Sequence, residues 1–172
     1  KTVAKAFPET LDPGVPEDLI YSGKASLTDP LEGTDVDLGK AVLSPTRTYA
    51  PIVREVLRNH RDRIHGMVHC SGGAQTKVMH FIEDLRVIKD DLFPIPPLFN
   101  AIKNASGTSW QEMYKVFNMG HRLEFYVPKE IAAEIIAISH SFNVEAKVIG
   151  RVEKSDQKEV VLRTINGEFK YS

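Results

Sequence analysis

Cysteine, tryptophan and long apolar runs are scarce in this sequence of 172 residues, which has one Cys and one Trp. Cys70 cannot form an internal disulfide, and no cysteine cluster has the spacing of a zinc site. We therefore expect a reducing, cytoplasmic location and no metal site. No run approaches the roughly 18 apolar residues of a membrane span, and no basic-then-apolar signal pattern opens the chain. Neither a membrane partner nor a targeting signal is predicted.

An excess of charge is also lacking, because 22 Lys and Arg face 23 Asp and Glu, for a net charge of −1. No field of the whole protein attracts nucleic acid or an anionic membrane, so any anion binding must be local. Hydrophobic residues make up 42% of the chain, enough for a core in one domain of this length. This composition excludes a disordered chain and a minimal stapled scaffold.

Prolines are concentrated near the N-terminus, where six of the ten fall within the first 51 residues. Each proline removes a backbone donor and restricts its predecessor, so residues 1–38 are predicted to form a Pro- and Gly-rich arm. Such an arm is unusual inside a compact domain, and Lys1 is not a start methionine. We expect residues 1–38 to be the end of a preceding domain and a crossing segment, and residues 39–172 to form a C-terminal α/β domain.

Hydrophobic periodicity predicts alternating strands and helices in the remaining chain. Leu123, Phe125 and Val127 alternate with polar residues, which indicates a half-buried strand, and a helix begins after Pro128. Strands are predicted over residues 39–43, 64–70, 85–89, 123–127, 144–152 and 160–164, and helices over residues 49–60, 76–84, from Pro97, after Ser109 and from Pro128. A polar turn at residues 154–158 leads to the partner strand 160–164, and Asn166-Gly167 predicts a hairpin turn. The fold class is therefore α+β, a mixed sheet with helices packed on it.

The segment from His69 to Lys77 carries the most chemical information. Gly72 and Gly73 separate a predicted strand from a predicted helix, where a ligand can approach the backbone and N–H groups can face an anion such as phosphate. Ser71 and Lys77 could add a hydroxyl and a charge. The spacing fits neither the Walker-A pattern nor the GxGxxG fingerprint. A simple turn with a solvent-facing lysine is the alternative.

Two histidines and the cysteine precede this turn. His65 and His69 lie four residues apart on one predicted strand and share a face. No third ligand is evident, so hydrogen-bonded histidines are favoured over a metal site. His69 is the better candidate for proton transfer. Cys70 could be a nucleophile, but a small buried hydrophobic residue is the favoured interpretation.

Two further segments could bind a polar ligand. Asn118 and Gly120 form a loop between a helix and a strand, where an amide can hold a ligand group, although Gly120 could equally be a helix C-cap. Thr46 and Arg47 follow Pro45, and the guanidinium suits phosphate or carboxylate, although a surface salt bridge would also explain it.

Taken in order, four segments resemble one family. These segments are residues 43–49, 65–73, 93–99 and 112–120, the last of which contains Met-Tyr-x-x-Phe-Asn-Met-Gly. The chain resembles the C-terminal half of aminoimidazole ribonucleotide synthetase, also called phosphoribosylformylglycinamidine cyclo-ligase. The resemblance runs from about Gly39 to Val152. The chain departs from the family pattern at Ala74, where a third glycine is usual, and at His121-Arg122, where a small apolar pair is usual.

The resemblance implies an ATP-dependent ring closure in purine biosynthesis, which converts formylglycinamidine ribonucleotide to aminoimidazole ribonucleotide. It implies a layered, partly ferredoxin-like C-terminal domain and a homodimer when the protein is complete. ATP and Mg²⁺ would bind chiefly in an N-terminal domain, so this chain alone is expected to be inactive. By position, His69, Ser71, Gly72 and Gly73 would line the cleft that faces that domain, with Asn118 and Gly120 on the adjoining loop. The alternatives are a non-catalytic anion-binding or regulatory module, or another ATP-using member of the same superfamily.

Overall fold

The computed structural model describes residue 14, residue 16 and residues 25–172. The elements in chain order are α2 (Leu38–Leu43), α3 (Ala50–His60), the 3₁₀ helix η3 (Arg61–Arg63), β1 (Gly66–His69), the 3₁₀ helix η4 (Ala74–His80), β2 (Leu85–Lys89), α4 (Pro97–Ser106), α5 (Trp110–Val116), β3 (Leu123–Tyr126), α6 (Lys129–Ser141), β4 (Gly150–Lys154), β5 (Glu159–Thr164) and β6 (Gly167–Tyr171). Of the helices in this described part, none has the length and apolar character needed to cross a bilayer.

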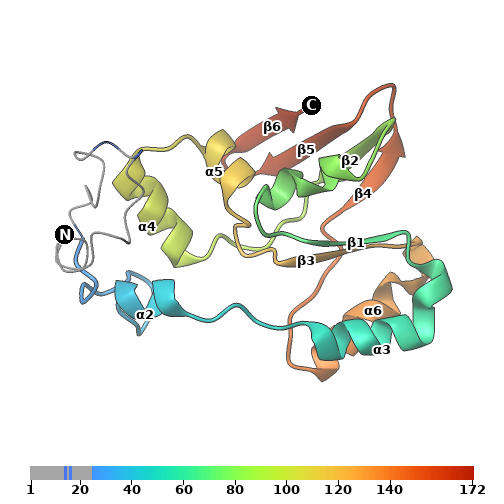
Figure 1. Cartoon of the computed structure of the whole chain (residues 1–172), viewed down its shortest axis with the longest axis horizontal. Helices are drawn as coiled ribbons and strands as arrows, with labels where there is room; N and C mark the ends of the chain where they lie inside the picture. The colour runs from blue at the N-terminus through green and yellow to red at the C-terminus, as the bar shows by residue number, and fades with distance from the viewer. Residues whose placement is uncertain (1–13, 15, 17–24) are drawn as a thin grey trace.

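The strands form two sheets (Figure 1). One is the antiparallel pair β1 and β3, in which Val68 lies opposite Glu124. The other has the order β4-β2-β5-β6, with β2 antiparallel to β4 and parallel to β5. The predicted α+β class, with a mixed sheet and helices packed on it, is confirmed.

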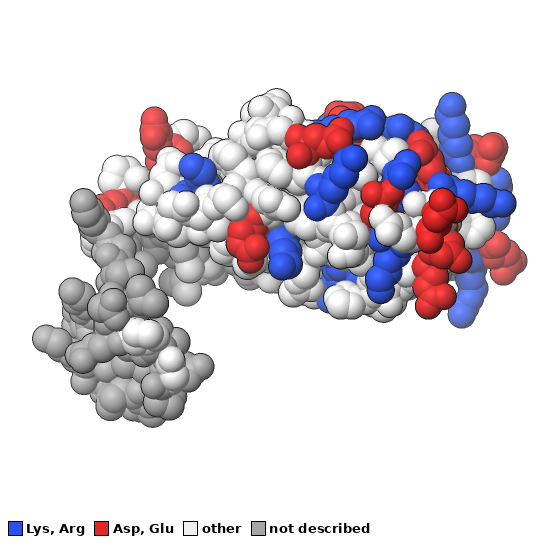
Figure 2. All heavy atoms as spheres, turned by 90° about the horizontal axis from the view of Figure 1, so that it is seen from above, with Lys and Arg blue, Asp and Glu red and all other residues white. Residues whose placement is uncertain are grey.

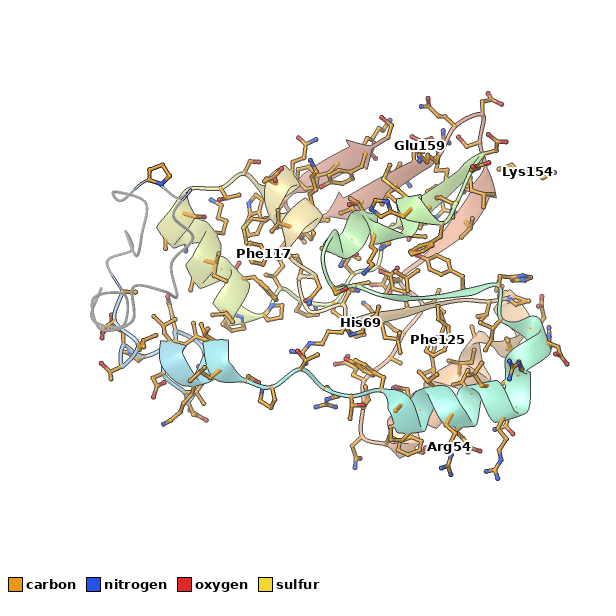
Figure 3. The ribbon with its side chains drawn as sticks, viewed as in Figure 1. Arg54, His69, Phe117, Phe125, Lys154 and Glu159 are labelled. Atoms are coloured by element: carbon orange, nitrogen blue, oxygen red, sulfur yellow. The ribbon has the colours of Figure 1, made fainter. Side chains whose placement is uncertain are left out.

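The β1–β3 pair lies between two hydrophobic cores. On one side α3 and α6 bury Val56 and Ile131, and Phe125 points from β3 toward these helices (Figure 3). On the other side Val68 and Cys70 join a larger core with the four-stranded sheet, η4 and α5. Because both faces of the pair are covered, the strand that the alternation marked as half-buried also buries its polar side: Glu124 is only 7% exposed.

Local start signals placed several helices correctly. Ser109 caps α5, where its hydroxyl accepts a hydrogen bond from the N–H of Glu112 at 3.3 Å. Pro97 and Pro51 occupy the first turns of α4 and α3, where a missing N–H is tolerated. These signals act within one helical turn, so they can be read without the tertiary structure.

The predicted strand over residues 39–43 is wrong, because this segment is the helix α2. Asp37 caps it by accepting the N–H of Lys40 at 2.7 Å. Gly39 packs so closely on the chain that a Cβ would lie 3.0 Å from the carbonyl oxygen of Leu27. The predicted arm, residues 1–38, lies largely outside the described residues. Its described end has an isolated bridge between Pro30 and Asp37.

Two other predicted elements have different bounds or type. The helix predicted over residues 76–84 is the 3₁₀ helix η4, which begins at Ala74 and ends at His80. The strand predicted over residues 144–152 begins only at Gly150, where β4 pairs with β2. Val148, in the unpaired part, is 54% exposed. Alternation predicted an extended chain there, but pairing depends on where the partner strand lies.

The predicted pairing of residues 144–152 with residues 160–164 is wrong as well. β4 and β5 are joined by the polar turn, yet β2 lies between them and pairs with both. The predicted hairpin between β5 and β6 is present, with Ile165 and Asn166 at the turn and Gly167 opening β6. The insertion of β2 brings the C-terminal end of that strand, with Lys89, into the interior.

Candidate functional site

The glycine loop, residues 71–73, connects the end of β1 to η4. Gly73 has φ +85° and Ala74 has φ +41°, so two successive residues adopt the left-handed region. The N–H of Ala74 donates to the carbonyl of Ser71 at 2.8 Å, which closes the turn. Ala74 stands where the family resemblance implies a third glycine, and its backbone explains why glycine is favoured there.

The glycine loop carries one hydroxyl that contacts Lys77 and two backbone N–H groups without a partner among the described residues. The ammonium of Lys77 donates to the hydroxyl of Ser71 at 2.7 Å, which places a positive charge on the loop. Within the described part of the chain, the N–H groups of Gly72 and Gly73 have no hydrogen-bond partner. No atom lies within 4 Å of the position that a Cβ on Gly72 would take. The loop therefore presents two free N–H groups, a hydroxyl and an ammonium beside open space.

This arrangement differs from the one that the sequence indicated, because η4 is a short 3₁₀ helix and not an α-helix. A short 3₁₀ helix has no long helix dipole, so the groups here that suit an anion are those of the loop and Lys77. On the face drawn in Figure 2, basic and acidic side chains are intermingled at one end of the molecule, with no single sign gathered there. This mixture agrees with the balanced composition, from which only local anion binding is predicted.

The second loop, residues 118–120, is bound by Gln75, a buried glutamine of η4, the helix that follows the glycine loop. The side-chain amide of Gln75 donates to the carbonyl of Asn118 at 2.7 Å. The Oδ1 atom of Asn118 accepts the N–H of Gly120 at 2.9 Å, while its Nδ2 donates to no described residue and so remains available to a ligand. Helix α5 ends at Val116, so Gly120 is not its C-cap. The φ of Gly120 is +97°.

A buried charged cluster lies beneath both loops. Lys89, at the end of β2, is 1% exposed, and its ammonium donates to Glu124 at 2.6 Å and to the backbone and side-chain oxygens of Gln75 at 2.9 and 3.1 Å. The other carboxylate oxygen of Glu124 accepts the Tyr126 hydroxyl at 2.6 Å. Burial and the neighbouring Glu124 raise the pKa of Tyr126, so its hydroxyl keeps the proton that it donates.

His69 lies at the end of β1 and faces the linker between α2 and α3 (Figure 3). The rings of His69 and Tyr49 meet edge to face, with centroids 6.5 Å apart. The side chain of His69 is exposed. His65 precedes β1 rather than lying on it. Throughout the described residues, no group of three or more His, Cys, Asp or Glu side chains is placed to hold a metal ion.

The predicted residues Thr46 and Arg47 lie on the linker that leads to Tyr49. Both are exposed, and neither side chain has a hydrogen bond or ion pair with any described residue. The surface salt bridge considered for Arg47 is therefore not formed within the described part. Successive Cα atoms are about 3.8 Å apart, so Arg47 lies within about 8 Å of Tyr49, which contacts His69. The linker thus passes near the end of β1, and its guanidinium is free to bind an anion.

Burial excludes the candidate Cys70 from direct chemistry, and it also keeps His121 neutral. Cys70 is 1% exposed, and burial, followed by the charge of Glu124, raises its pKa to about 12, so it is a thiol and a poor nucleophile. The buried interpretation of Cys70 is supported. His121 is also buried, and burial lowers its pKa to about 4. Its neutral ring accepts the N–H of Phe93 at 3.1 Å through Nε2.

Sequence reasoning missed Gln75, Lys89 and Glu124 as members of one cluster. Lys89 ends a strand that also contains Arg86, and Glu124 lies inside an alternating strand, so each resembled a solvent-facing residue. The available signal was a positive residue at the end of one strand and a negative residue inside another, but its use required the pairing of distant segments.

The described residues form an α+β domain in which the glycine loop runs into η4, and Gln75 of η4 binds the loop of Asn118. The chain matches the family described as "AIR synthase related protein, C-terminal domain" over residues 19–163. It is 35% identical to a phosphoribosylformylglycinamidine cyclo-ligase of Methanopyrus kandleri, over 68% of this chain and 33% of that protein. It is 36% identical to the cyclo-ligase of Geobacillus thermodenitrificans, over 78% of this chain and 39% of that protein.

The chain belongs to the AIR synthase related family, in the region of its C-terminal domain. The resemblance drawn from the sequence motifs is confirmed, and the relatives are named as ligases. The chain spans about a third of the length of these curated relatives.

Proposed function

We propose that this chain supplies the substrate-binding C-terminal domain of a phosphoribosylformylglycinamidine cyclo-ligase, which closes the imidazole ring of aminoimidazole ribonucleotide at the expense of ATP. In this reaction ATP activates the formyl amide oxygen of formylglycinamidine ribonucleotide, the amidine nitrogen attacks, and phosphate leaves. The glycine loop carries this proposal, because the free N–H groups of Gly72 and Gly73, the Ser71 hydroxyl and the Lys77 ammonium suit a phosphate group of the ribonucleotide.

The remaining predicted residues have consistent roles in this proposal. The free Nδ2 of Asn118 binds an acceptor of the substrate, and Gly120 keeps that loop in place. Arg47 and Thr46 approach the substrate from the linker. His69 orients the substrate or transfers a proton, since it is exposed at the end of the strand that enters the glycine loop.

ATP and Mg²⁺ belong, in this proposal, to an N-terminal ATP-binding domain, as the family resemblance implies. The relatives' additional length is consistent with such a domain. Residues 1–38 would then connect that domain to residues 39–172. The chain alone would have no turnover, and the complete protein would be a cytoplasmic homodimer.

The test measures ATP-dependent formation of aminoimidazole ribonucleotide by the 172-residue chain, alone and with the ATP-binding domain attached. We expect turnover only with both domains, and a loss of about 100-fold or more in kcat/KM for Gly72→Val, whose side chain fills the space over the loop. Lys77→Gln should raise KM more than it lowers kcat. Full activity of the isolated chain would contradict the proposal.

The role of His69 is tested in the same assay with a separate variant. His69→Gln should lower kcat and alter its pH profile, because glutamine retains a polar group but cannot exchange a proton at neutral pH. An unchanged rate and profile would make His69 structural. Binding of phosphorylated substrate without any ring closure in the two-domain protein would instead favour the anion-binding module.

A further inference from the structure

The buried ammonium of Lys89 is paired with the buried carboxylate of Glu124. Its ammonium reaches three acceptors, one carboxylate oxygen of Glu124 and two oxygens of Gln75, and these distances run from 2.6 to 3.1 Å. The side chains of Lys89 and Glu124 are 2% and 6% exposed. A lysine has three donors, so all of its hydrogen-bonding capacity is used inside the protein. None remains for a ligand.

The acceptors lie on the elements that follow the two loops, because Gln75 is in η4 and Glu124 is in β3. Gln75 is separated from the glycine loop only by Ala74, and Lys89 donates to both its backbone and its side chain. The same side chain donates through Nε2 to Asn118 in the second loop. Lys89 lies at the end of β2 and Glu124 lies in β3, so the cluster connects two separate sheets.

Stability of the fold does not account for such a cluster by itself. The desolvation of two buried charges largely offsets their attraction, and apolar residues of similar volume often serve a core equally well. The particular property of this cluster is its directionality: Lys89 fixes the backbone and side chain of Gln75, and Gln75 in turn holds the carbonyl of Asn118 in the second loop. Gln75, which is completely buried, joins the charged pair to both.

Resting on the proposed function above, we propose that Lys89 and Glu124 are positioning residues, which act through Gln75 to hold the glycine loop and the Asn118–Gly120 loop at a fixed separation for one phosphorylated ligand. They do not touch the ligand. Without them the sheets still form, but the N–H groups of Gly72 and Gly73 lose their fixed direction relative to Asn118.

The test uses the double variant Lys89→Met/Glu124→Met in the 172-residue chain, which removes both charges and retains side-chain volume. A matched control is Arg86→Met/Glu159→Gln. It removes the ion pair between Arg86 of β2 and Glu159 of β5, in which neither residue contacts Gln75 or Asn118 through a hydrogen bond. Backbone amide NMR signals report on Gly72, Gly73 and Gly120, and ribose 5-phosphate is the titrated probe.

We expect the double variant to remain folded, with the three glycine signals shifted or broadened and the Kd for ribose 5-phosphate raised about tenfold. The control should leave both readouts unchanged. A folded double variant with native glycine signals and native Kd would overturn the proposal.

Gln75→Leu provides a second variant if the double variant does not fold. It removes the bonds from Gln75 to Asn118 and from Lys89 to its Oε1, while the charged pair stays intact. The same shift of the Gly120 signal and the same loss of affinity are expected, and native values for both would overturn the proposal. If the unchanged chain does not bind ribose 5-phosphate, the proposed function fails, and the glycine signals alone decide the positioning role.

Discussion

The ammonium of Lys89 lies 2.6 Å from a carboxylate oxygen of Glu124, although the two residues are 35 positions apart and almost completely buried. This contact joins the end of β2 to β3, and thus the four-stranded sheet to the β1–β3 pair. Gln75 extends it to the glycine loop. The predicted phosphate-binding groups therefore rest on a buried polar support.

Removal of one partner of this pair should be far more damaging than removal of both. Lys89→Met leaves Glu124 as an uncompensated buried charge, and the free energy of unfolding should fall by about 3–5 kcal/mol. Arg163→Met in the neighbouring strand β5 is the control, because Arg163 and Glu168 are 51% and 46% exposed and their pairing is screened by solvent. That variant should cost about 1 kcal/mol or less. Urea unfolding at pH 7 compares the two, and equal losses would contradict the expected difference.

Acid should destabilise the protein through His121. The pKa of His121 is about 4 in the folded chain against 6.5 in the unfolded chain, because burial disfavours its charged form. The stability that the neutral ring contributes is complete above pH 6.5 and is lost as the pH falls from 6.5 toward 4. Between pH 7 and pH 5 the unfolded state binds more protons at this site, which should cost about 2 kcal/mol.

Urea unfolding of the wild type and of His121→Gln at these two pH values isolates this contribution. Glutamine can accept the N–H of Phe93 but does not titrate. The variant should lose about 2 kcal/mol less than the wild type between pH 7 and pH 5. The same loss in both proteins would exclude His121 as the titrating group.

The thiol of Cys70 should be unreactive in the folded chain. Its pKa of about 12 leaves almost no thiolate at pH 8, and its side chain is buried. A thiol reagent such as Ellman's reagent should therefore react only after urea is added. Rapid labelling of the native chain would instead support the nucleophile alternative.

The two glycines of the candidate loops should respond differently to alanine. In Gly120→Ala the new Cβ would lie 3.1 Å from Cγ of Pro96, at a residue with φ +97°. Stability should fall by about 1–3 kcal/mol. Gly72→Ala meets open space and should stay within about 0.5 kcal/mol of the wild type. Thermal unfolding of both variants measures this contrast, which disappears if the Asn118–Gly120 loop does not have the described conformation.

The sequence predicted those parts of the fold that depend on neighbouring residues. Pro97 and Ser109 mark helix starts, and alternation marks β3, because these signals act within one turn or one strand. The pairing of β2 with both β4 and β5 depends on chain segments more than 60 residues apart, so alternation could not place β2 between them.

The candidate site was predictable to a similar extent. Gly72, Gly73 and Asn118 were identified from short motifs, and the structure connects their loops through Gln75. Lys89 was not identified, because a lysine at the end of a strand is normally solvated and only the tertiary fold encloses it.

The most direct test of the central claim is an amide NMR titration of the 172-residue chain with ribose 5-phosphate. We predict saturable shifts of the Gly72 and Gly73 signals, since their N–H groups are unpaired among the described residues and lie beside Lys77. These shifts should disappear in Gly72→Val and weaken in Lys77→Gln, while the signals of α6 stay unchanged in every variant. Shifts that leave Gly72 and Gly73 unaffected, or a native Kd for Gly72→Val, would contradict the assignment of the glycine loop as the phosphate site.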